Sequence, residues 1–360
     1  MAKNGKKIEE LRNKIDAIDL KILKLLNERT GHVLEVGTTK RKDNTEFYQP
    51  DREREIYERL TTENTGPFPD HALKSVFREI ISASLSLESP LKVAYLGPPA
   101  TFTHQACMEQ FGLSGEFVPR SEIEEVFDEV ERGRTEFGVV PIENTAEGVV
   151  SHTLDMFVTS ELKICAEVML EVSLALMNKS GKMKDVDRVS SHPHALAQCD
   201  KWLKEKLPKV PVVDAASTAA AAQAASVDPR TAAIASEAAA TLYDLRVVEK
   251  KVEDQPHNFT RFLVIGKGKE PKKTGRDKTS AMFATKDTPG ALYAMLKPFA
   301  SRGINLTKIE SRPLRSKAWE YIFFLDMDGH VSEDPIKEAL GELEKLGSFF
   351  KLLGSYPKSN

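Results

Sequence analysis

The chain has 360 residues, of which 41% are hydrophobic and 29% charged, and its formal net charge is -3 at pH 7. This length predicts two or three domains, and the balanced charge gives no support for a nucleic-acid or membrane-surface partner. Cys107, Cys165 and Cys199 are widely spaced and odd in number, so we expect buried thiols, without disulfides, a metal site or a cofactor.

The first forty residues have the apolar period of a helix. Apolar side chains recur at steps of three and four, which predicts one long amphipathic helix to about Lys42: Ile8, Leu11, Ile15, Ile18, Ile22, Leu25, Val33 and Val36. The N-terminus lacks a signal peptide, and no later stretch is long and apolar enough to span a membrane. We therefore expect a cytoplasmic protein.

Three cations interrupt this apolar stripe. At 100° per residue, Arg29 and Lys40 fall inside the stripe, and Arg12 lies at its edge. A cation in an apolar core is costly without an anionic partner. The partner is either a carboxylate of the same chain or a small anionic ligand.

Two shorter helices follow the long one. The first begins at Gln49-Pro50-Asp51, and the second runs from about residue 70 to 88. The apolar face of the second ends in polar residues one turn apart. These helices carry two carboxyl groups and a hydroxyl that can meet the cations, on the residues Glu53, Ser84 and Glu88. Internal salt bridges and a bound dicarboxylate with a hydroxyl both fit this pattern.

The spacing of this polar set resembles the active site of the all-α chorismate mutases: Arg12, Arg29, Lys40, Arg52, Glu53, Ser84 and Glu88. The resemblance implies an all-α chorismate mutase domain over residues 1–90, in a homodimer whose protomers exchange the long helix. It implies that Arg12 and Arg29 bind the two carboxylates of chorismate. It also implies that Lys40 donates to the breaking ether oxygen and that Glu53 accepts from the substrate hydroxyl.

Two residues depart from the best-known version of this pattern. Gln49 replaces an aspartate that helps to bind the hydroxyl, and its amide oxygen can still accept a hydrogen bond. Glu88 replaces a glutamine that donates to the ether oxygen. A carboxyl group donates only when it is protonated, so we expect mutase activity to rise toward acid pH.

Residues 91–267 alternate short apolar runs with helical segments, which predicts an α/β domain with mainly parallel strands. Polar turns follow the expected strands near residues 101–103, 143–145, 190–192, 217–218 and 236–237. Each turn can be an ordinary helix cap, but turns at the same ends of parallel strands also gather around a cleft. A long strand over 162–177 is expected to lead into a second half, and a strand at 262–265 to return to the first.

Residues 258–262, Asn-Phe-Thr-Arg-Phe, run into an apolar segment that ends at Gly266. Thr260 and Arg261 therefore stand at the entrance of a strand, which is a rigid place for polar groups. Together with residues 141–145, Pro-Ile-Glu-Asn-Thr, and 191–193, Ser-His-Pro, this stretch resembles the signature segments of prephenate dehydratases. The whole chain resembles the bifunctional chorismate mutase/prephenate dehydratases.

The resemblance implies that residues 91–267 form a bilobal dehydratase domain, similar to periplasmic binding proteins. Prephenate loses carbon dioxide and water, and its departing hydroxyl needs a proton or a strong hydrogen bond. The resemblance assigns this role to Thr260. A hydroxyl has little acidity by itself, so it needs support from a relay through His192 or Glu143, or from Arg261 holding the substrate. Three further residues are expected to bind the substrate: Asn144, Thr145 and Ser191.

The C-terminal part begins after a segment rich in lysine, glycine and proline over 268–278, which predicts an exposed linker. The order βαββαβ is expected over 279–360, and it resembles a ferredoxin-like α+β ACT domain. Two segments match the phenylalanine-binding segments of that family: Gly290, Ala291 and Leu292, and Glu310, Ser311, Arg312 and Pro313. The resemblance implies phenylalanine as an effector, and an unliganded dimerisation module is the alternative.

The sequence thus predicts a multidomain enzyme of phenylalanine biosynthesis with chorismate and prephenate as substrates. One alternative is a non-catalytic amino-acid-sensing protein, and another is a dehydratase that uses arogenate and releases phenylalanine. Arg29, Lys40 and Thr260 separate the enzyme from the sensor, because a sensor needs none of them.

Overall fold

The computed structural model of the chain describes residues 2–42, 50–146, 148–268, 271–285, 288–313 and 321–359. The chain divides into two compact units. The first comprises Met1–Gln49, Glu55–Leu91 and Phe111–Gly115, and the second comprises the rest.

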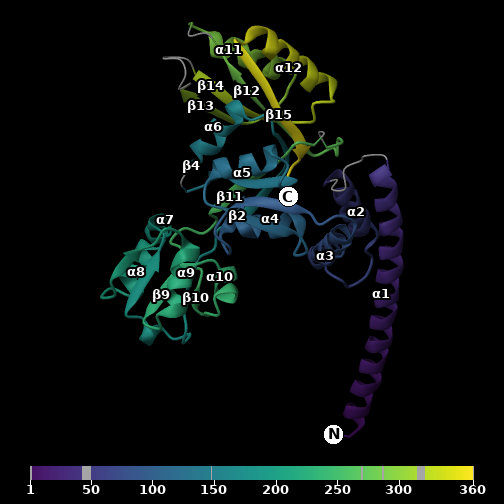
Figure 1. The fold of residues 1–360 in the computed structure, drawn as a ribbon, viewed down its shortest axis with the longest axis vertical. Helices are drawn as coiled ribbons and strands as arrows, with labels where there is room; N and C mark the ends of the chain where they lie inside the picture. The colour runs from purple at the N-terminus through teal and green to yellow at the C-terminus, as the bar shows by residue number, and fades with distance from the viewer. Residues whose placement is uncertain are drawn as a thin grey trace. The chain divides into compact units, whose positions relative to one another are not determined.

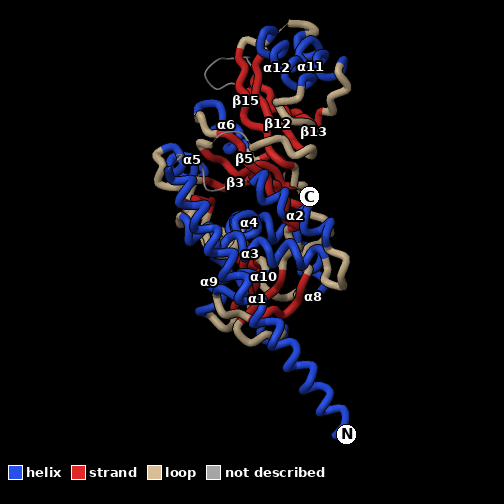
Figure 2. The backbone as a smooth tube through the Cα atoms, turned by 90° about the vertical axis from the view of Figure 1, so that its right-hand side faces the viewer, coloured by secondary structure: helices blue, strands red, loops and turns tan. Residues whose placement is uncertain are grey.

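The first unit contains the three helices that the sequence predicts, α1 (Ala2–Lys42), α3 (Asp70–Glu88) and most of α2 (Pro50–Glu63). The C-terminal half of α1 packs on α3, where a Cβ atom on the buried Gly37 would lie 2.9 Å from Cγ of Glu88. The N-terminal half of α1 extends past α3 (Figures 1 and 2). Its apolar stripe, Ile8, Leu11, Ile15, Ile18, Ile22 and Leu25, is 49–62% exposed.

The second unit begins with a lobe built on a six-stranded sheet, in the order β2-β1-β3-β11-β5 with β4 paired to β3. The strands are β1 (Lys92–Leu96), β2 (Glu116–Arg120), β3 (Phe137–Asn144), β4 (Gly148–Val149), β5 (Lys163–Glu171) and β11 (Phe259–Gly266), and the helices are α4 (Phe102–Phe111), α5 (Ile123–Glu131) and α6 (Ser151–Thr159). β1 is parallel to β2 and β3, whereas β11 is antiparallel to β3 and β5. The predicted return of the chain to the first half is confirmed.

The second lobe is a five-stranded sheet in the order β10-β6-β9-β7-β8. Its elements are β6 (Ala175–Asn178), the 3-10 helix η1 (Met183–Asp185), β7 (Arg188–Ser191), α7 (Pro193–Gln198), α8 (Asp200–Lys206), β8 (Val212–Asp214), α9 (Thr218–Val227), β9 (Thr231–Ala235), α10 (Glu237–Leu242) and β10 (Arg246–Lys250). Four of the six alanines of α9 are buried. Their short side chains let this helix lie close to the sheet.

The long strand expected over 162–177 is wrong, because β5 and β6 belong to different sheets. Residues between them cross from one lobe to the other, and the chain returns in front of β11. These two connections are hydrogen-bonded to each other, from the amide of Val172 to the carbonyl of Asn258 at 2.7 Å and from the amide of Val252 to the carbonyl of Leu174 at 3.0 Å. The bilobal α/β architecture is confirmed.

The C-terminal part has the predicted βαββαβ order, and its sheet follows the order β13-β14-β12-β15. The elements are β12 (Asp277–Ala284), α11 (Ala291–Ser301), β13 (Leu306–Pro313), β14 (Tyr321–Asp328), α12 (Asp334–Leu346) and β15 (Phe349–Pro357). Phe283 and Leu325 face the two helices, whereas Met282 and Phe324 share a core with Leu263 of the first lobe. One hydrophobic core therefore joins this domain to the strand β11.

The predicted exposed linker differs from the structure at its C-terminal end. Pro271 and Asp277 are buried, and Oδ1 of Asp277 accepts from the hydroxyl of Thr274 at 2.6 Å. Because these residues are held in place, only part of the 268–278 segment has the properties that its composition predicts.

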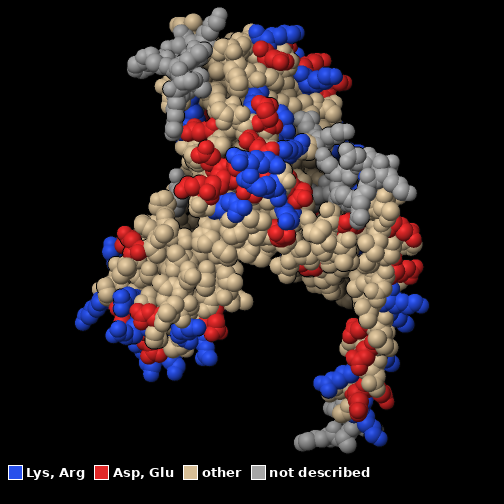
Figure 3. All heavy atoms as spheres, viewed as in Figure 1, with Lys and Arg blue, Asp and Glu red and all other residues tan. Residues whose placement is uncertain are grey.

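Charges of both signs are interspersed over α5 (Figure 3). Arg134 pairs with Asp128 at 2.7 Å and with Glu129 at 2.9 Å, and Arg120 also reaches Glu129 at 3.0 Å. The three cysteines are buried and free, as the sequence predicts. A helix with the length and hydrophobicity needed to cross a membrane is not found in the part of the chain that the structure describes.

Candidate functional site

The helical unit brings three of the predicted mutase residues together at the contact between α1 and α3. Nη1 of Arg29 donates to Oγ of Ser84 at 2.8 Å, and that hydroxyl donates to the carbonyl of Ile80 at 2.7 Å. Ser84 is 6% exposed and Glu88, one turn later, is 7% exposed. Partial burial lowers the pKa of Arg29, and the negative charge of Glu88 acts in the opposite direction. A cation, a hydroxyl and a carboxyl group thus converge in a mostly buried setting.

The other predicted mutase residues have different surroundings. Lys40 is half-buried on α1, and Arg52 is exposed on the first turn of α2. Glu53 is half-buried there, and burial raises the pKa of its carboxyl to about 8. Gln49 lies outside the described residues.

Arg12 cannot share a substrate with Arg29 of the same helix. The two residues are 17 positions apart, which is roughly 25 Å along a helix axis. Chorismate is far smaller than this, and Arg12 is exposed. Within one chain, the structure does not bring these two arginines to one site.

The dehydratase residues Asn144 and Thr260 face each other on neighbouring strands. Nδ2 of Asn144 donates to Oγ1 of Thr260 at 2.7 Å, while Oδ1 of Asn144 accepts from the amide of Ala146 at 2.8 Å. A backbone amide can only donate, so this second bond fixes which end of Asn144 faces Thr260. Thr260 must therefore accept, and its own proton has no acceptor among the described residues. The hydroxyl is set up as a donor.

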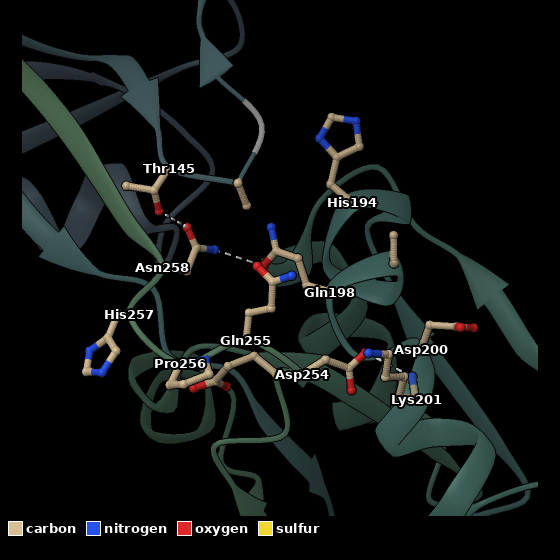
Figure 4. A pocket seen from close by; sticks show the side chains of 13 residues that line it. Thr145, His194, Gln198, Asp200, Lys201, Asp254, Gln255, Pro256, His257 and Asn258 are labelled. Carbon is tan, nitrogen blue, oxygen red and sulfur yellow. Dashed lines mark hydrogen bonds between the residues drawn. The ribbon is translucent and has the colours of Figure 1, made fainter.

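A second series of hydrogen bonds starts one residue further along. The amide of Phe259 donates to Oγ1 of Thr145 at 2.9 Å, and that hydroxyl donates to Oδ1 of Asn258 at 3.0 Å. Nδ2 of Asn258 then donates to Oε1 of Gln198 at 3.1 Å (Figure 4). Thr145 belongs to the first lobe and Gln198 to the second. Asn258 therefore bridges the two lobes.

Thr145, Gln198 and Asn258 line a cavity of about 700 Å³ between the lobes, and Asn144 and Thr260 lie next to its wall in the sequence without lining it. Its walls come from the turn after β3, from α7 and α8, and from the connection that leads to β11: Thr145, Ala146, His194, Ala197, Gln198, Asp200, Lys201 and residues 253–258. Figure 4 shows Asn258 between Thr145 and Gln198, with a hydrogen bond to each. His257, beside Asn258, has a positive φ of 68°, which is uncommon for a residue with a side chain. The cavity suits a small polar ligand.

Two predicted substrate ligands of the second lobe do not line this cavity. The hydroxyl of Ser191 is buried and donates to the carbonyl of Ile234 at 2.6 Å. His192 caps α7, and its Nδ1 accepts from the amide of His194 at 3.3 Å. A relay from His192 to Thr260 therefore has no support in these contacts, and Asn144 is the partner that Thr260 has.

Glu143 and Arg261 contact the C-terminal domain instead of the cavity. Nζ of Lys308, on β13, lies 2.6 Å from Oε2 of Glu143. Arg261 is 6% exposed and binds Asp326 of β14 at 2.5 Å. Burial opposes the charge of Arg261, but Tyr356, Asp326 and Glu167 outweigh it and raise the pKa of the guanidinium. The predicted role of Arg261 as a substrate ligand is not supported by this placement.

The predicted effector segments lie on α11 and β13. Gly290 precedes α11 with a positive φ of 81°, and Ala291 and Leu292 form its first turn. On the edge strand β13, Glu310 is half-buried, whereas Ser311 and Pro313 are exposed. Arg312 reaches back to α6, where it donates to Oγ of Ser151 and lies 3.4 Å from Asp155.

Three family models match the chain in succession: chorismate mutase type II over residues 11–89, prephenate dehydratase over 93–270 and the ACT domain over 282–345. The bifunctional chorismate mutase/prephenate dehydratase of Aquifex aeolicus is 51% identical over 98% of both chains. The protein of that name from Pseudomonas aeruginosa is 43% identical, again over 98% of both chains.

The chain belongs to the bifunctional chorismate mutase/prephenate dehydratase family.

A solved relative of this family's dehydratase and ACT parts is a prephenate dehydratase from Arthrobacter aurescens, in complex with L-phenylalanine. It is 36% identical to this chain, with a TM-score of 0.69. The match covers 74% of this chain and 90% of the Arthrobacter chain.

Sequence reasoning missed Gln198 in this chorismate mutase/prephenate dehydratase chain, and it gave no role to Asn258. Asn258 stood at the start of the segment that the sequence singled out, so the signal was present. Gln198 ends a short helix without any local polar motif. Among the described residues, no three His, Cys, Asp or Glu side chains are grouped so that they could hold a metal ion.

Proposed function

We propose that this chain rearranges chorismate to prephenate in its helical unit and converts prephenate to phenylpyruvate between the two lobes. The observation that carries the dehydratase half is the donor hydroxyl of Thr260, which Asn144 orients at 2.7 Å. The match to both catalytic family models, in one chain of a bifunctional family, supports the pairing of the two reactions.

The mutase step needs no nucleophile, only a compact substrate conformer and stabilisation of charge on the breaking ether bond. Arg29 has four further guanidinium N–H donors beyond the one that Ser84 accepts, and it binds one carboxylate of chorismate. Lys40 and Glu88 act at the ether oxygen, and Glu53, with Arg52 and Gln49, binds the hydroxyl side of the substrate. These roles follow from the family pattern and from the convergence of Arg29, Ser84 and Glu88.

The mutase site is completed by a second copy of the chain. Arg12 is too far along α1 to reach the substrate held by Arg29, so the second carboxylate is bound by Arg12 of the partner subunit. The half-exposed apolar stripe of residues 8–25 supplies the contact surface for such a homodimer. We also propose that the protein works in the cytoplasm.

In the dehydratase step, the electron pair of the bond to the ring carboxylate moves into the ring, carbon dioxide leaves and the ring hydroxyl departs. Thr260 donates a hydrogen bond to this departing oxygen, which leaves as water with a proton from solvent. Thr145, Asn258 and Gln198 bind the polar groups of prephenate. Phenylalanine binds the ACT domain at residues 290–292 and 310–313 and inhibits dehydration.

Incubation of the pure protein with chorismate, with separate detection of prephenate and phenylpyruvate, tests this function. Formation of both products is expected. Absence of both leaves the amino-acid-sensing alternative. A parallel incubation with arogenate, followed by detection of phenylalanine, tests the second alternative, and faster turnover of arogenate than of prephenate would reassign the substrate.

A further inference from the structure

The pairing of β3 with β11 places two residue pairs next to each other. Asn144 is the neighbour of Thr260, and Glu143 is the neighbour of Arg261. Successive side chains of a strand point to opposite faces of the sheet. Asn144 and Thr260 bind each other, while Glu143 and Arg261 bind residues of the ACT domain. The ACT domain therefore holds the residue adjacent to each member of the Asn144–Thr260 pair.

The contacts of Arg261 form a closed set, which we call the Arg261 cluster: Arg261, Glu167, Lys278, Ser280, Asp326 and Tyr356. Arg261 donates from Nε to Glu167 at 2.7 Å, from Nη1 to Asp326 at 2.5 Å and from Nη2 to the hydroxyl of Tyr356 at 3.0 Å. Lys278 reaches Glu167 at 2.7 Å, and Ser280 donates to Asp326 at 2.5 Å. Two cations meet two carboxylates, so the cluster is neutral.

Burial restricts the geometry of the Arg261 cluster. Asp326 and Tyr356 are 0% exposed, and Glu167 and Arg261 are each 6% exposed. Buried charges are tolerated only in arrangements that satisfy every partner, so the Arg261 cluster has few alternative geometries. β12, β14 and β15 of the ACT domain all contribute to it. A shift of these strands moves Arg261 or leaves a buried charge without its partner.

The second contact begins on the strand that carries a predicted effector segment. The half-buried residues of β13 alternate, so that Lys308, Glu310 and Arg312 share one face. Lys308 binds Glu143 at 2.6 Å, and its side chain is only 9% exposed. A movement of β13 would therefore act on Glu143, the residue next to Asn144.

The backbone of β3 is irregular at the same place. Arg261 pairs with Glu143 and Phe262 with Pro141, so β3 has one extra residue, Ile142, at this point. Such bulges redirect side chains and are frequent beside active sites. The bulge therefore lies next to Glu143 on β3, whereas β11 keeps a regular ladder with β5 from Phe259 to Val264.

We propose that Glu143 and Arg261 are positioning residues through which the ACT domain holds the Asn144–Thr260 pair, and that phenylalanine inhibits dehydration by changing these two contacts. This inference rests on the proposed function, and it extends that function by naming the residues of the coupling. Neither residue touches the substrate in this account.

Two variants test the two contacts separately. Asp326→Asn keeps the shape of the Arg261 cluster but removes one of its charges, and Lys308→Met removes the partner of Glu143 without leaving a deeply buried charge, because Glu143 is 39% exposed. In both variants, kcat for prephenate should fall at least about tenfold and KM should change less than about twofold. The phenylalanine concentration for half-inhibition should rise. Circular dichroism and the thermal unfolding of the same preparation report on the folding of the unit that carries both substitutions.

Lys351→Met is the matched control. Lys351 belongs to the same interface, where it donates to the carbonyl of Ser160 at 2.5 Å, but neither residue adjoins Asn144 or Thr260. This variant should keep the wild-type kcat and the wild-type inhibition. Equal behaviour of all three variants would overturn the proposal, and so would a large rise of KM at constant kcat, because that result identifies substrate ligands.

The activity of the wild-type protein tests the proposed function separately from this proposal. If the wild-type protein is inactive, the proposed function is wrong. Amide hydrogen exchange of residues 258–262 then tests whether the two contacts hold the strand of Thr260. Faster exchange in Asp326→Asn and Lys308→Met than in Lys351→Met supports it. Unchanged exchange in all three variants contradicts it.

Discussion

An arginine lies among apolar residues both in the helical unit and at the interface between the first lobe and the ACT domain. The two arginines differ in how many of their donors are bound by the protein. Arg29 lies in an apolar stripe, half-buried, with one hydroxyl as a partner and with guanidinium donors left for a ligand. Arg261 also precedes an apolar run, but all its nitrogens meet protein oxygens in a closed, neutral cluster. A cation among apolar residues is the proposed ligand site in the first region, whereas in the second it connects two domains.

The apolar surfaces of the two regions also differ in how far this chain buries them. The stripe at the N-terminal half of α1 is about half exposed, whereas Leu263, Met282 and Phe324 are fully or almost fully buried in one core. The dehydratase and ACT parts therefore bury their apolar surface within one chain. In the proposed homodimer, the stripe of the helical unit is covered by a second chain, and four variants test this contrast.

The largest effect is expected at Thr260. Thr260→Ala removes the donor at the departing hydroxyl, and general acid assistance of this kind contributes about 10²- to 10⁴-fold to a rate. Dehydration should fall by that factor while the mutase rate stays within about twofold, because the helical unit has its own residues. Thr260→Ser, which keeps a hydroxyl, is the control. Equal loss of both activities in the alanine variant would contradict separate sites.

Ile15→Asp should break the contact between two copies of α1. Burial of an unpaired carboxylate costs several kcal/mol, so the dimer should weaken by roughly 100-fold or more. Mutase activity should then depend on protein concentration, and dehydration should change less. Light scattering and both assays over a dilution series measure this. Asn13→Asp adds the same charge on the opposite side of the helix, and a similar loss in that variant would show that the stripe is not the interface.

Glu88→Gln should preserve mutase activity near neutral pH or raise it by up to about tenfold, the equivalent of one hydrogen bond. Glutamine keeps the shape of the side chain and is a permanent donor, whereas glutamate donates only when it is protonated. The wild-type rate should rise toward acid pH, and the variant should show a flatter profile. An inactive glutamine variant would show that Glu88 does not contact the ether oxygen.

The smallest effect is expected at Glu53, on the pH dependence of stability. The direction of this effect follows from the pKa of the Glu53 carboxyl. Burial raises this pKa from 4.5 to about 8, so the folded chain holds a proton that the unfolded chain releases between these values. The stabilisation is complete below pH 4.5 and is lost as the pH rises toward 8. Glu53→Gln should therefore reduce the fall of Tm between pH 5 and 8.5 by a few degrees. Glu55→Gln, an exposed change on the same helix, should follow wild type.

Periodicity predicted the three helices of the first unit and the ACT topology, because apolar spacing reports which face is buried. It failed at residues 162–177, where Val172, Ser173 and Leu174 continue an apolar, strand-like pattern without glycine or proline. Nothing local marks the point at which the chain leaves one sheet for another. Tertiary pairing decides that point.

Three residues of the candidate site, Asn144, Thr145 and Thr260, could be predicted because each is a polar residue inside a recognisable sequence segment. Alternation in a strand shows that Thr260 and Arg261 point to opposite faces, but it does not reveal what covers each face. The partner of Arg261 lies 65 residues away in another domain. The domain limits at residues 90, 267 and 278 remain predictions.

The position of β15 along β5 has a consequence for the first lobe alone. β5 is the last strand of its sheet, and Gly354 of β15 comes so close that a Cβ atom would lie 2.3 Å from the carbonyl oxygen of Ile164. A chain that ended before β12 would leave this long, apolar strand with an uncovered edge, which is a template for pairing with other molecules. The ACT domain thus also protects the catalytic lobe from aggregation, and its removal should yield an insoluble dehydratase instead of an unregulated one.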